Sequence, residues 1–333
     1  MLSTKPNMDK FNLKYNIMRL IGICLSLLFF QQVVNAQIEM PDMIEIQDFA
    51  HIDTTYTYEW EEETGKWDIY ARDLNYIDQS RLVTSVLTQR WYKDSEQWEN
   101  YEQELKSHDE SGNVVQSVLQ QWNRNARDWI NVEMKTTTYD RRGNEAEILY
   151  QEWHRPTEEW LNTVVYLISY NRSFEKSEVV VRTYAGMENR WDNYLRFSFS
   201  YRDGYGPPYE VLVNTWKKPE DYWQTFGRYN LSYNNRGKVT QETRATWSES
   251  HRDWILGVRY LMSYRRDNIV EDVEQKYDYT SMEWVNTIRK TFEYDNNTGD
   301  LAREARYKWD KSDGEWEVEK RLLYTADKPD VGL

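Results

Sequence analysis

Pairs of aromatic residues recur along the chain, with six residues between the two members of each pair. The flat faces of tryptophan and tyrosine rings stack on sugar rings, so a regular row of them could bind a polysaccharide. The same rings could instead pack against one another, and their unbroken repetition favours this structural role. The positions with glycan-stacking or structural potential are Trp91, Trp98, Trp122, Trp129, Trp153, Trp160, Trp216, Trp223, Trp247 and Trp254.

Histidine is too sparse to suggest metal binding or acid–base catalysis. No two histidines are spaced as metal ligands, and three of the four lie in or beside expected turns. The sequence also lacks the motifs of metalloproteases, serine hydrolases and phosphate-binding loops. The four histidines are His51, His108, His154 and His251, and a solvated position in or beside a turn is the favoured interpretation for three of them.

Acidic clusters suggest two further chemistries. Carboxylates at 61–63 and 158–159 could cleave glycosides, but such clusters recur in most loops and are better interpreted as solvated charge. The segment 295–300 offers oxygen ligands to calcium, yet it lacks the glutamate that ends a longer calcium-binding loop. We therefore expect a protein that is not an enzyme and that holds no cofactor or metal.

The aromatic pairs mark an internal repeat of about 31 residues. Their second members follow one another at intervals of 30 to 32 residues, which gives nine units from Trp60 to Tyr324. Tyr184 and Tyr277 replace tryptophan as the first member in two units. Ten residues after the second member comes another landmark, usually tyrosine, and then a turn such as 140–144 with Asp, Gly and Asn. Each unit therefore consists of two strands and two turns.

Side-chain alternation favours strands over helices. Runs rich in β-branched and aromatic residues are separated by turn signals every 10 to 15 residues. Nine units predict an all-β fold, a single antiparallel meander of about 18 strands. Alternation also places one set of residues on the same face as Trp160, namely Asn162, Val164, Tyr166, Ile168 and Tyr170.

The face that carries the tryptophans changes in character along the chain. It is apolar from the fourth unit onward, as with Leu195 and Phe197, but carries Glu102 and Glu104 in the second unit. We expect a better-buried C-terminal half and a wetter N-terminal half. A β-bulge that switches the two faces is the alternative.

Strand twist makes a large flat sheet unfavourable, so we expect a curled or partly closed single-layer shell with the tryptophan face inward. The aromatic pairs would form a ladder at one rim, and the tyrosines a second ladder at the opposite rim. The nine repeats form one domain over 56–325, with a lead-in segment at 37–55 and a tail at 326–333.

The first 36 residues have the features of a secretory signal peptide. A basic stretch precedes an apolar run from Leu20 to Phe30, and small residues precede the expected cleavage after Ala36. The 11-residue run is shorter than the roughly 20 residues that span a bilayer. Cys24 fits a lipid-modified cysteine poorly because Ile23 precedes it. We expect an exported protein of the periplasm, cell surface or extracellular space, with no membrane span after cleavage.

Removal of this segment changes both the cysteine count and the charge. The mature chain has no cysteine, so neither disulfides nor thiolate metal sites stabilise it. The loss of four basic residues and one acid changes the net charge from −14 to −17. Such a charge repels nucleic acid and anionic lipid. Proteins and polysaccharides are the classes of partner that this charge leaves open.

The segment Tyr139 to Asn144, with weaker copies at 108–109 and 294–295, resembles the tyrosine-aspartate (YD) repeats of bacterial RHS-type surface and toxin-shell proteins. The paired-tryptophan hairpins are similar to tryptophan-rich repeats of proteins exported by Bacteroidota. The resemblance extends over nearly the whole mature chain but rests on short motifs. It implies a spiralling β-shell and a secreted or surface scaffold, and it brings no catalytic residue.

Three functions compete. The leading hypothesis is a non-catalytic envelope or surface scaffold that binds a protein or glycan partner. The second is a carbohydrate-binding module that uses exposed tryptophan and tyrosine rows. An outer-membrane β-barrel is the third, because an even strand number near 18 is typical of that class. A mean hydropathy of −0.92 disfavours it, as do arginines expected on the face opposite the tryptophans, namely Arg196, Arg228, Arg259 and Arg289.

Overall fold

The computed structural model describes residues 49–296 and 298–325, which form eighteen β-strands and one short 3-10 helix, η2 (Gly186–Glu188). The expected signal peptide and tail lie outside these residues, and the first strand begins within the range expected as a lead-in. The strands are β1 (Phe49–Glu61), β2 (Lys66–Asp78), β3 (Val83–Tyr92), β4 (Gln97–His108), β5 (Val114–Asn123), β6 (Asp128–Tyr139), β7 (Glu145–His154), β8 (Glu159–Tyr170), β9 (Lys176–Ala185), β10 (Arg190–Ser200), β11 (Glu210–Lys217), β12 (Tyr222–Tyr233), β13 (Val239–Ser248), β14 (Asp253–Arg265), β15 (Asn268–Asp278), β16 (Glu283–Tyr294), β17 (Leu301–Asp310) and β18 (Glu315–Thr325).

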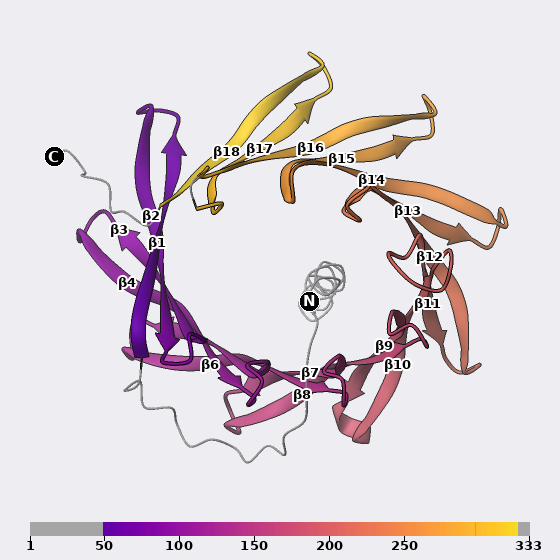
Figure 1. Ribbon diagram of the computed structural model, residues 1–333, viewed down its shortest axis with the longest axis horizontal. Helices are drawn as coiled ribbons and strands as arrows, with labels where there is room; N and C mark the ends of the chain where they lie inside the picture. The colour runs from indigo at the N-terminus through magenta and orange to yellow at the C-terminus, as the bar shows by residue number, and fades with distance from the viewer. Residues whose placement is uncertain (1–48, 297, 326–333) are drawn as a thin grey trace, which may run out of the picture.

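The strands close into a single-sheet barrel. Each strand pairs antiparallel with its neighbours in the chain, and β1 also pairs with β18, where Tyr58 lies opposite Leu323. Figure 1 shows the resulting ring of hairpins. Closure pairs the first and last strands and so removes both sheet edges. The predicted antiparallel meander of 18 strands is confirmed, and the expected shell is fully closed.

Turns with Asx side chains join successive units at one rim. The Oδ1 atom of Asp140 accepts the backbone N–H groups of Arg142 at 2.8 Å and Asn144 at 2.9 Å. Gly143, in the same turn, has φ of +80°, a conformation that glycine adopts without strain. The same pair of Asx bonds forms in the turns that begin at Asp78, Asp109, Asn171 and Asn234.

The hairpin turns at the opposite rim store backbone strain. The last loop residue before each second strand has positive φ, but it is glycine in only two of the nine loops, Gly65 and Gly314. Glu96, Arg127 and Arg252 hold this conformation with φ of +49°, +54° and +51°. A left-handed conformation costs an L-residue about 1 to 2 kcal/mol.

Glycine at these positions should therefore stabilise the barrel. We expect Glu96→Gly and Arg127→Gly each to raise the free energy of unfolding by about 0.5 to 1 kcal/mol, since the relieved strain exceeds the extra entropy of the unfolded chain. Glu96→Ala keeps the Cβ atom and should give no such gain. Denaturant unfolding measures both, and equal stability of the Gly and Ala variants would contradict the argument.

A β-bulge in every hairpin reverses the expected face assignment. In β8, Asn162 pairs with Gln151 and Val164 pairs with the adjacent Tyr150, so Thr163 is an extra residue. The bulge recurs three residues after the second aromatic residue in all nine hairpins. The prediction that Val164, Tyr166, Ile168 and Tyr170 share the face of Trp160 is therefore wrong; the bulge alternative is correct.

One buried cluster forms the core, and it lies on the face opposite the tryptophans. By register all ten of its members share this face, and Ile148 and Tyr166 are almost completely inaccessible to solvent. The members are Ile148, Tyr150, Tyr166, Ile168, Val179, Val181, Phe197, Val211, Val213 and Leu231. Side chains converge on the concave side of a closed sheet, so this face is the inner wall.

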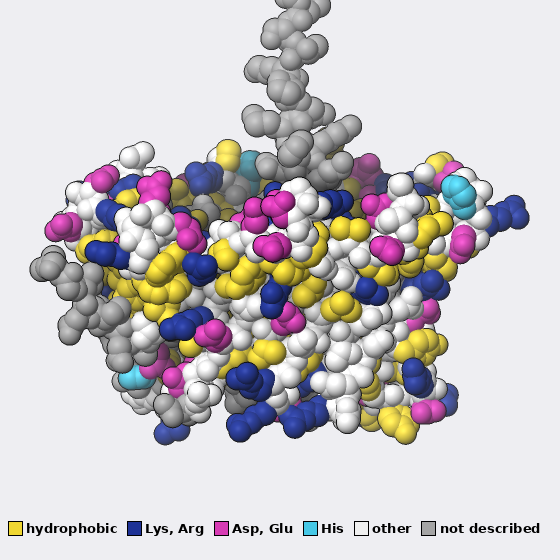
Figure 2. Space-filling model, turned by 90° about the horizontal axis from the view of Figure 1, so that it is seen from above, with side chains coloured by type: hydrophobic (Ala, Val, Ile, Leu, Met, Phe, Trp, Pro, Cys, Tyr) yellow, Lys and Arg dark blue, Asp and Glu magenta, His cyan; other side chains and the backbone are white. Residues whose placement is uncertain are grey.

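The tryptophan face is consequently the outer wall, not the inner face that the sequence predicted. Figure 2 shows a band of hydrophobic side chains around the visible outer wall close to one rim. The core also differs in position from the expected better-buried C-terminal half. It extends from β7 to β12, in the middle of the array, because charged residues such as Glu242 and Asp272 replace apolar ones on the inner wall beyond it.

Tyrosines at the rim opposite the tryptophans form the second predicted ladder. The Tyr139 hydroxyl donates to the Val114 carbonyl oxygen at 3.0 Å, and Tyr170 donates to that of Glu145 at 2.9 Å. Two more tyrosines repeat this bond one and two units later, Tyr201 to Lys176 and Tyr233 to Pro208, each at 2.7 Å. Each bond joins a residue at or just after the end of one strand to a residue at or just before the start of the preceding strand, which holds the hairpins in register.

Candidate functional site: an aromatic girdle on the outer wall

The nine aromatic pairs form one belt near a rim of the barrel, which we call the girdle. In each pair the two residues lie opposite each other in register, as Trp153 lies opposite Trp160. Their ring centroids are 5.0 to 5.3 Å apart and their planes are inclined by 60° to 71°, so each pair packs edge to face. Such packing contributes about 0.5 to 1.5 kcal/mol per pair beyond burial. The girdle therefore stabilises every hairpin.

The girdle is also accessible to solvent all the way round. All sixteen tryptophans are partly exposed, and none is either buried or fully exposed. The ten tryptophans singled out in the sequence thus occupy equivalent places on the outer wall in five of the nine pairs. This uniform half-burial combines a packing role with ring surface that a ligand could contact.

Amide side chains form a second row directly beside the girdle. Gln151 lies two residues before Trp153, and Asn162 lies two residues after Trp160, on the same face as both rings. Gln151 Nε2 donates to Asn162 Oδ1 at 3.0 Å. Gln120 donates to Asn131 at 2.7 Å in the preceding hairpin. The same amide pairing occurs in Gln89 with Asn100 and Gln275 with Asn286. Polar donors and acceptors therefore lie within one side chain of the aromatic rings.

Arginines cap the rings in part of the girdle. The fifth residue after the second aromatic residue is arginine in six units, and it lies on the outer wall because of the bulge. In four of these units the guanidinium covers the second tryptophan of the next hairpin, whereas Arg289 lies near the Tyr307 ring and Arg321 near the Trp60 ring. The distances from Cζ to the ring centroid are 4.6 Å for Arg72 on Trp98, 5.0 Å for Arg196 on Trp223, 4.4 Å for Arg228 on Trp254 and 4.6 Å for Arg259 on Trp284.

These arginines correct one further prediction. Arg196, Arg228, Arg259 and Arg289 were expected on the face opposite the tryptophans, but the bulge places them on the tryptophan face. Sequence reasoning missed their role as caps. Their recurrence at a fixed position of the repeat was the signal that could have found it.

Three consecutive units lack the cap. Gln103, Met134 and Val165 stand at the position of the arginine, and among the described residues no cation lies over the rings that follow them, Trp129, Trp160 and Trp191. We call the outer face of β5 to β8 the uncapped sector. By register Glu147, at the end far from the girdle, is the single charged side chain on that face of the four strands.

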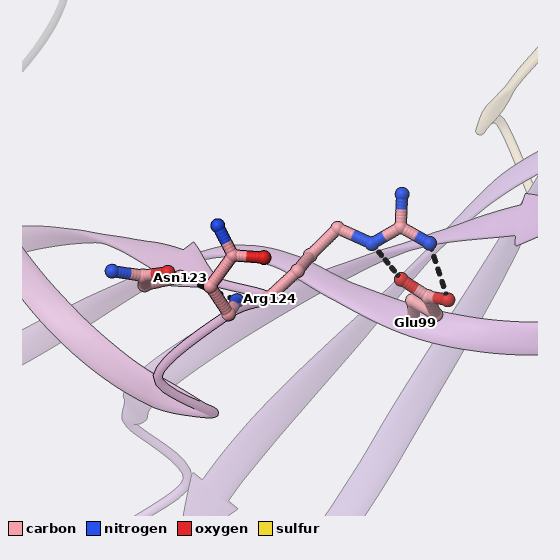
Figure 3. Close-up of polar contacts among 4 residues, drawn as sticks. Glu99, Asn123 and Arg124 are labelled. Atoms are coloured by element: carbon pink, nitrogen blue, oxygen red, sulfur yellow. Dashed lines mark hydrogen bonds and ion pairs between the residues drawn. The ribbon is translucent and has the colours of Figure 1, made fainter.

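Polar contacts join the hairpins at the girdle rim. Arg124, in the loop that follows Asn123, reaches Glu99 on β4 with Nη2 and Nε at 2.6 and 2.5 Å (Figure 3). This hydrogen bond raises the pKa of the Arg124 guanidinium. The Arg124 guanidinium also lies 4.3 Å from the Tyr92 ring. Because the pair is exposed, its contribution is to loop position rather than to stability.

The inner wall holds a polar cluster beside the core. Arg244 Nε donates to the buried Glu242 at 2.5 Å, and the Arg244 guanidinium lies 4.7 Å from the Tyr260 ring. Burial raises the pKa of the nearby Asp272 carboxyl group, while Lys290 opposes this shift. Charge is thus largely compensated within the cluster, which favours a structural role. Sequence alternation missed it because the bulge was not placed.

Of the remaining predicted residues, His251 lies in a hairpin loop, His108 and His154 end β4 and β7 next to turns, and His51 lies within β1. His251 Nδ1 is 2.9 Å from Ser248 Oγ, and His154 Nδ1 is 2.9 Å from Thr157 Oγ1. The acidic clusters 61–63 and 158–159 lie in or next to the hairpin loops at the girdle rim. No group of three metal-ligating side chains occurs in residues 49–296 and 298–325, and position 297 of the calcium-like segment lies outside them.

Comparisons with known proteins give weak likenesses only. No family model and no curated protein matches the chain. A porin-like protein from Bacteroides uniformis has 11% identity and a TM-score of 0.38, over 83% of this chain and 98% of that one. A Bacteroides fragilis protein of unknown function has 15% identity and a TM-score of 0.35, over 39% of this chain and 91% of that one.

The TcdB2-TccC3-Cdc42 complex contains a chain with 10% identity and a TM-score of 0.23, over 83% of this chain and 20% of that one. No repeat family is established, and TM-scores this low carry no argument about function. In the described part of the chain, no helix has the length and apolar character needed to cross a membrane.

Proposed function

We propose that this chain is a non-catalytic, exported carbohydrate-binding protein, and that its ligand lies on the outer wall against the girdle. The observation that carries the proposal is the outward, half-exposed position of every tryptophan in a regular belt. Rings on the outside of the barrel present apolar faces on which the C–H groups of a sugar ring stack.

The amide row supports a carbohydrate ligand over an apolar one. Sugars require hydrogen-bond partners beside the surface on which they stack, because each unsatisfied hydroxyl loses its bonds to water. Gln151 and Asn162 lie beside Trp153 and Trp160 on the same face. No comparable patch of described residues on the loops of the rim marks a protein partner.

A closed barrel with aromatic rings near a rim also resembles an outer-membrane barrel in outline. The outer wall argues against that function, because Arg196, Arg228 and Arg259 lie on it below the girdle. Each arginine on a lipid-facing wall costs about 2 to 4 kcal/mol at the membrane midplane. A membrane-spanning band of apolar side chains would be interrupted in two thirds of the units.

Binding to a panel of soluble neutral and acidic polysaccharides tests the proposal. We expect saturable heat in calorimetry and a change in tryptophan fluorescence with at least one of them, because the ligand contacts indole rings. Circular dichroism confirms that the protein is folded. A folded protein that gives neither signal with any polysaccharide would overturn the proposed function.

A further inference from the structure

Resting on the proposed function, we infer that the glycan binds the uncapped sector and that it is an uncharged polysaccharide running around the wall, across β5 to β8. Arginines shield Trp98, Trp223, Trp254 and Trp284 from such a ligand. Trp129 and Trp160 are the stacking platforms. Asn131 and Asn162, one side chain away from them, supply the hydrogen bonds.

The distribution of the arginines distinguishes this sector from the rest of the girdle. Over Trp223 and Trp254 a guanidinium lies 5.0 and 4.4 Å from the ring centroid, where it occupies the face that a sugar would need. Val165 and Met134 replace the arginines that would lie over Trp191 and Trp160. A ligand that stacks on the girdle therefore meets rings without an arginine in these consecutive hairpins, whereas an arginine covers Trp98, Trp223, Trp254 and Trp284.

The spacing of the uncovered rings suits an extended polymer. Trp129 and Trp160 stand at the same position of successive hairpins, two strands apart. Two strand separations are roughly 9 to 10 Å, which corresponds to every second sugar of an extended chain. A single polysaccharide crossing the strands can thus stack on both rings, and the interval leaves room for one sugar between them.

The amides have unused donors for that intervening sugar. Asn131 and Asn162 each accept a hydrogen bond from a glutamine through Oδ1, which leaves the Nδ2 group as donor. Neither Nδ2 group donates a hydrogen bond to another described residue. Planar amides fixed in orientation by a glutamine are pre-organised for sugar hydroxyls.

Charge argues for a neutral ligand. The sector has no cation on its outer face, and Glu147 is its single charged residue. The chain as a whole has a net charge of −14. An acidic polysaccharide would meet repulsion without a compensating arginine, whereas a neutral one gains the stacking and amide contacts without that penalty.

The decisive variant adds the missing cap. Met134→Arg places on the sector the residue that six other units carry at this position, so the barrel keeps its fold while the Trp160 face becomes covered. We expect at least a tenfold loss of affinity for the neutral polysaccharide that the panel identifies, equivalent to about 1.4 kcal/mol. Trp160→Ala should give a similar loss.

Matched controls lie in the capped part of the girdle. Trp254→Ala removes an equivalent ring under Arg228 and should change the affinity less than about twofold, within roughly 0.4 kcal/mol. Arg228→Met reverses the design, since it uncovers Trp254 on an otherwise intact wall. Calorimetry gives the affinity of each variant, and circular dichroism confirms its fold.

The outcomes separate this inference from the function on which it rests. Loss of binding in Met134→Arg but not in Trp254→Ala supports the uncapped sector. Unchanged binding in Met134→Arg, or loss only in Trp254→Ala, overturns the sector but leaves a glycan-binding protein. Tighter binding of acidic than of neutral polysaccharides overturns the ligand class. An absence of binding to every polysaccharide overturns the proposed function itself.

Discussion

Tyr166→Ala should destabilise the barrel by about 3 to 5 kcal/mol, the cost of truncating a large buried ring and leaving a cavity. Tyr166 is 1% exposed in the centre of the inner-wall cluster, and its ring centroid lies 5.8 Å from that of Tyr150. A single-layer barrel has no second sheet to fill the space. Chemical denaturation, with tryptophan fluorescence as the probe, measures the loss.

Tyr205→Ala is the matched control, because Tyr205 is 64% exposed. Its effect should stay within about 0.5 kcal/mol, as for most surface substitutions. If both variants lose the same small amount of stability, the inner-wall cluster is not the core of the fold.

Raising the pH above 10 should unfold the protein through its tyrosine ladder. Burial raises the pKa of Tyr139 to about 12, and it raises the pKa of Tyr170, Tyr201 and Tyr233 as well. The unfolded chain ionises at the ordinary tyrosine pKa near 10, so it loses protons before the folded chain does. The stability from the ladder is therefore complete below pH 10 and is lost as the pH rises through the folded pKa values.

Replacing the four ladder tyrosines with phenylalanine separates ionisation from packing. The variant loses four hydroxyl-to-carbonyl hydrogen bonds, so its free energy of unfolding at neutral pH should fall by about 1 kcal/mol per bond. Its stability should then decline much less between pH 10 and 12. Unfolding curves at several pH values test this, and an equally steep decline in the variant would assign alkaline unfolding to other groups.

The repeat itself can be identified from the amino-acid sequence alone. The six-residue interval between Trp122 and Trp129 matches a tight hairpin whose ends face each other, and the structure pairs them directly. Asp140 and Gly143 marked the turn at the opposite rim for an equally local reason, since an Asx side chain and a positive φ are properties of a few neighbouring residues. Strand number and hairpin order followed from these two landmarks.

The sequence did not reveal which side chains lie on the inner wall and which on the outer wall, because this depends on one extra residue in each hairpin. That residue is Val132 in β6, Thr163 in β8 and Gly257 in β14, and no shared side chain identifies it. A shift of one residue exchanges every later side chain between the two faces. Expectations for the inner and outer wall were therefore reversed beyond the bulge, including those for Phe197 and Arg196.

The nine-unit order of aromatic hairpins can be predicted from the sequence alone, because hairpin pairing and turn geometry are encoded in residues close together in the chain. The pairing of β1 with β18, the outward direction of the tryptophans and the position of Arg228 over Trp254 become visible in the folded barrel alone. These features arise from closure and curvature. They depend on the register and the bulges of all eighteen strands together, so the residues of a single repeat do not determine them.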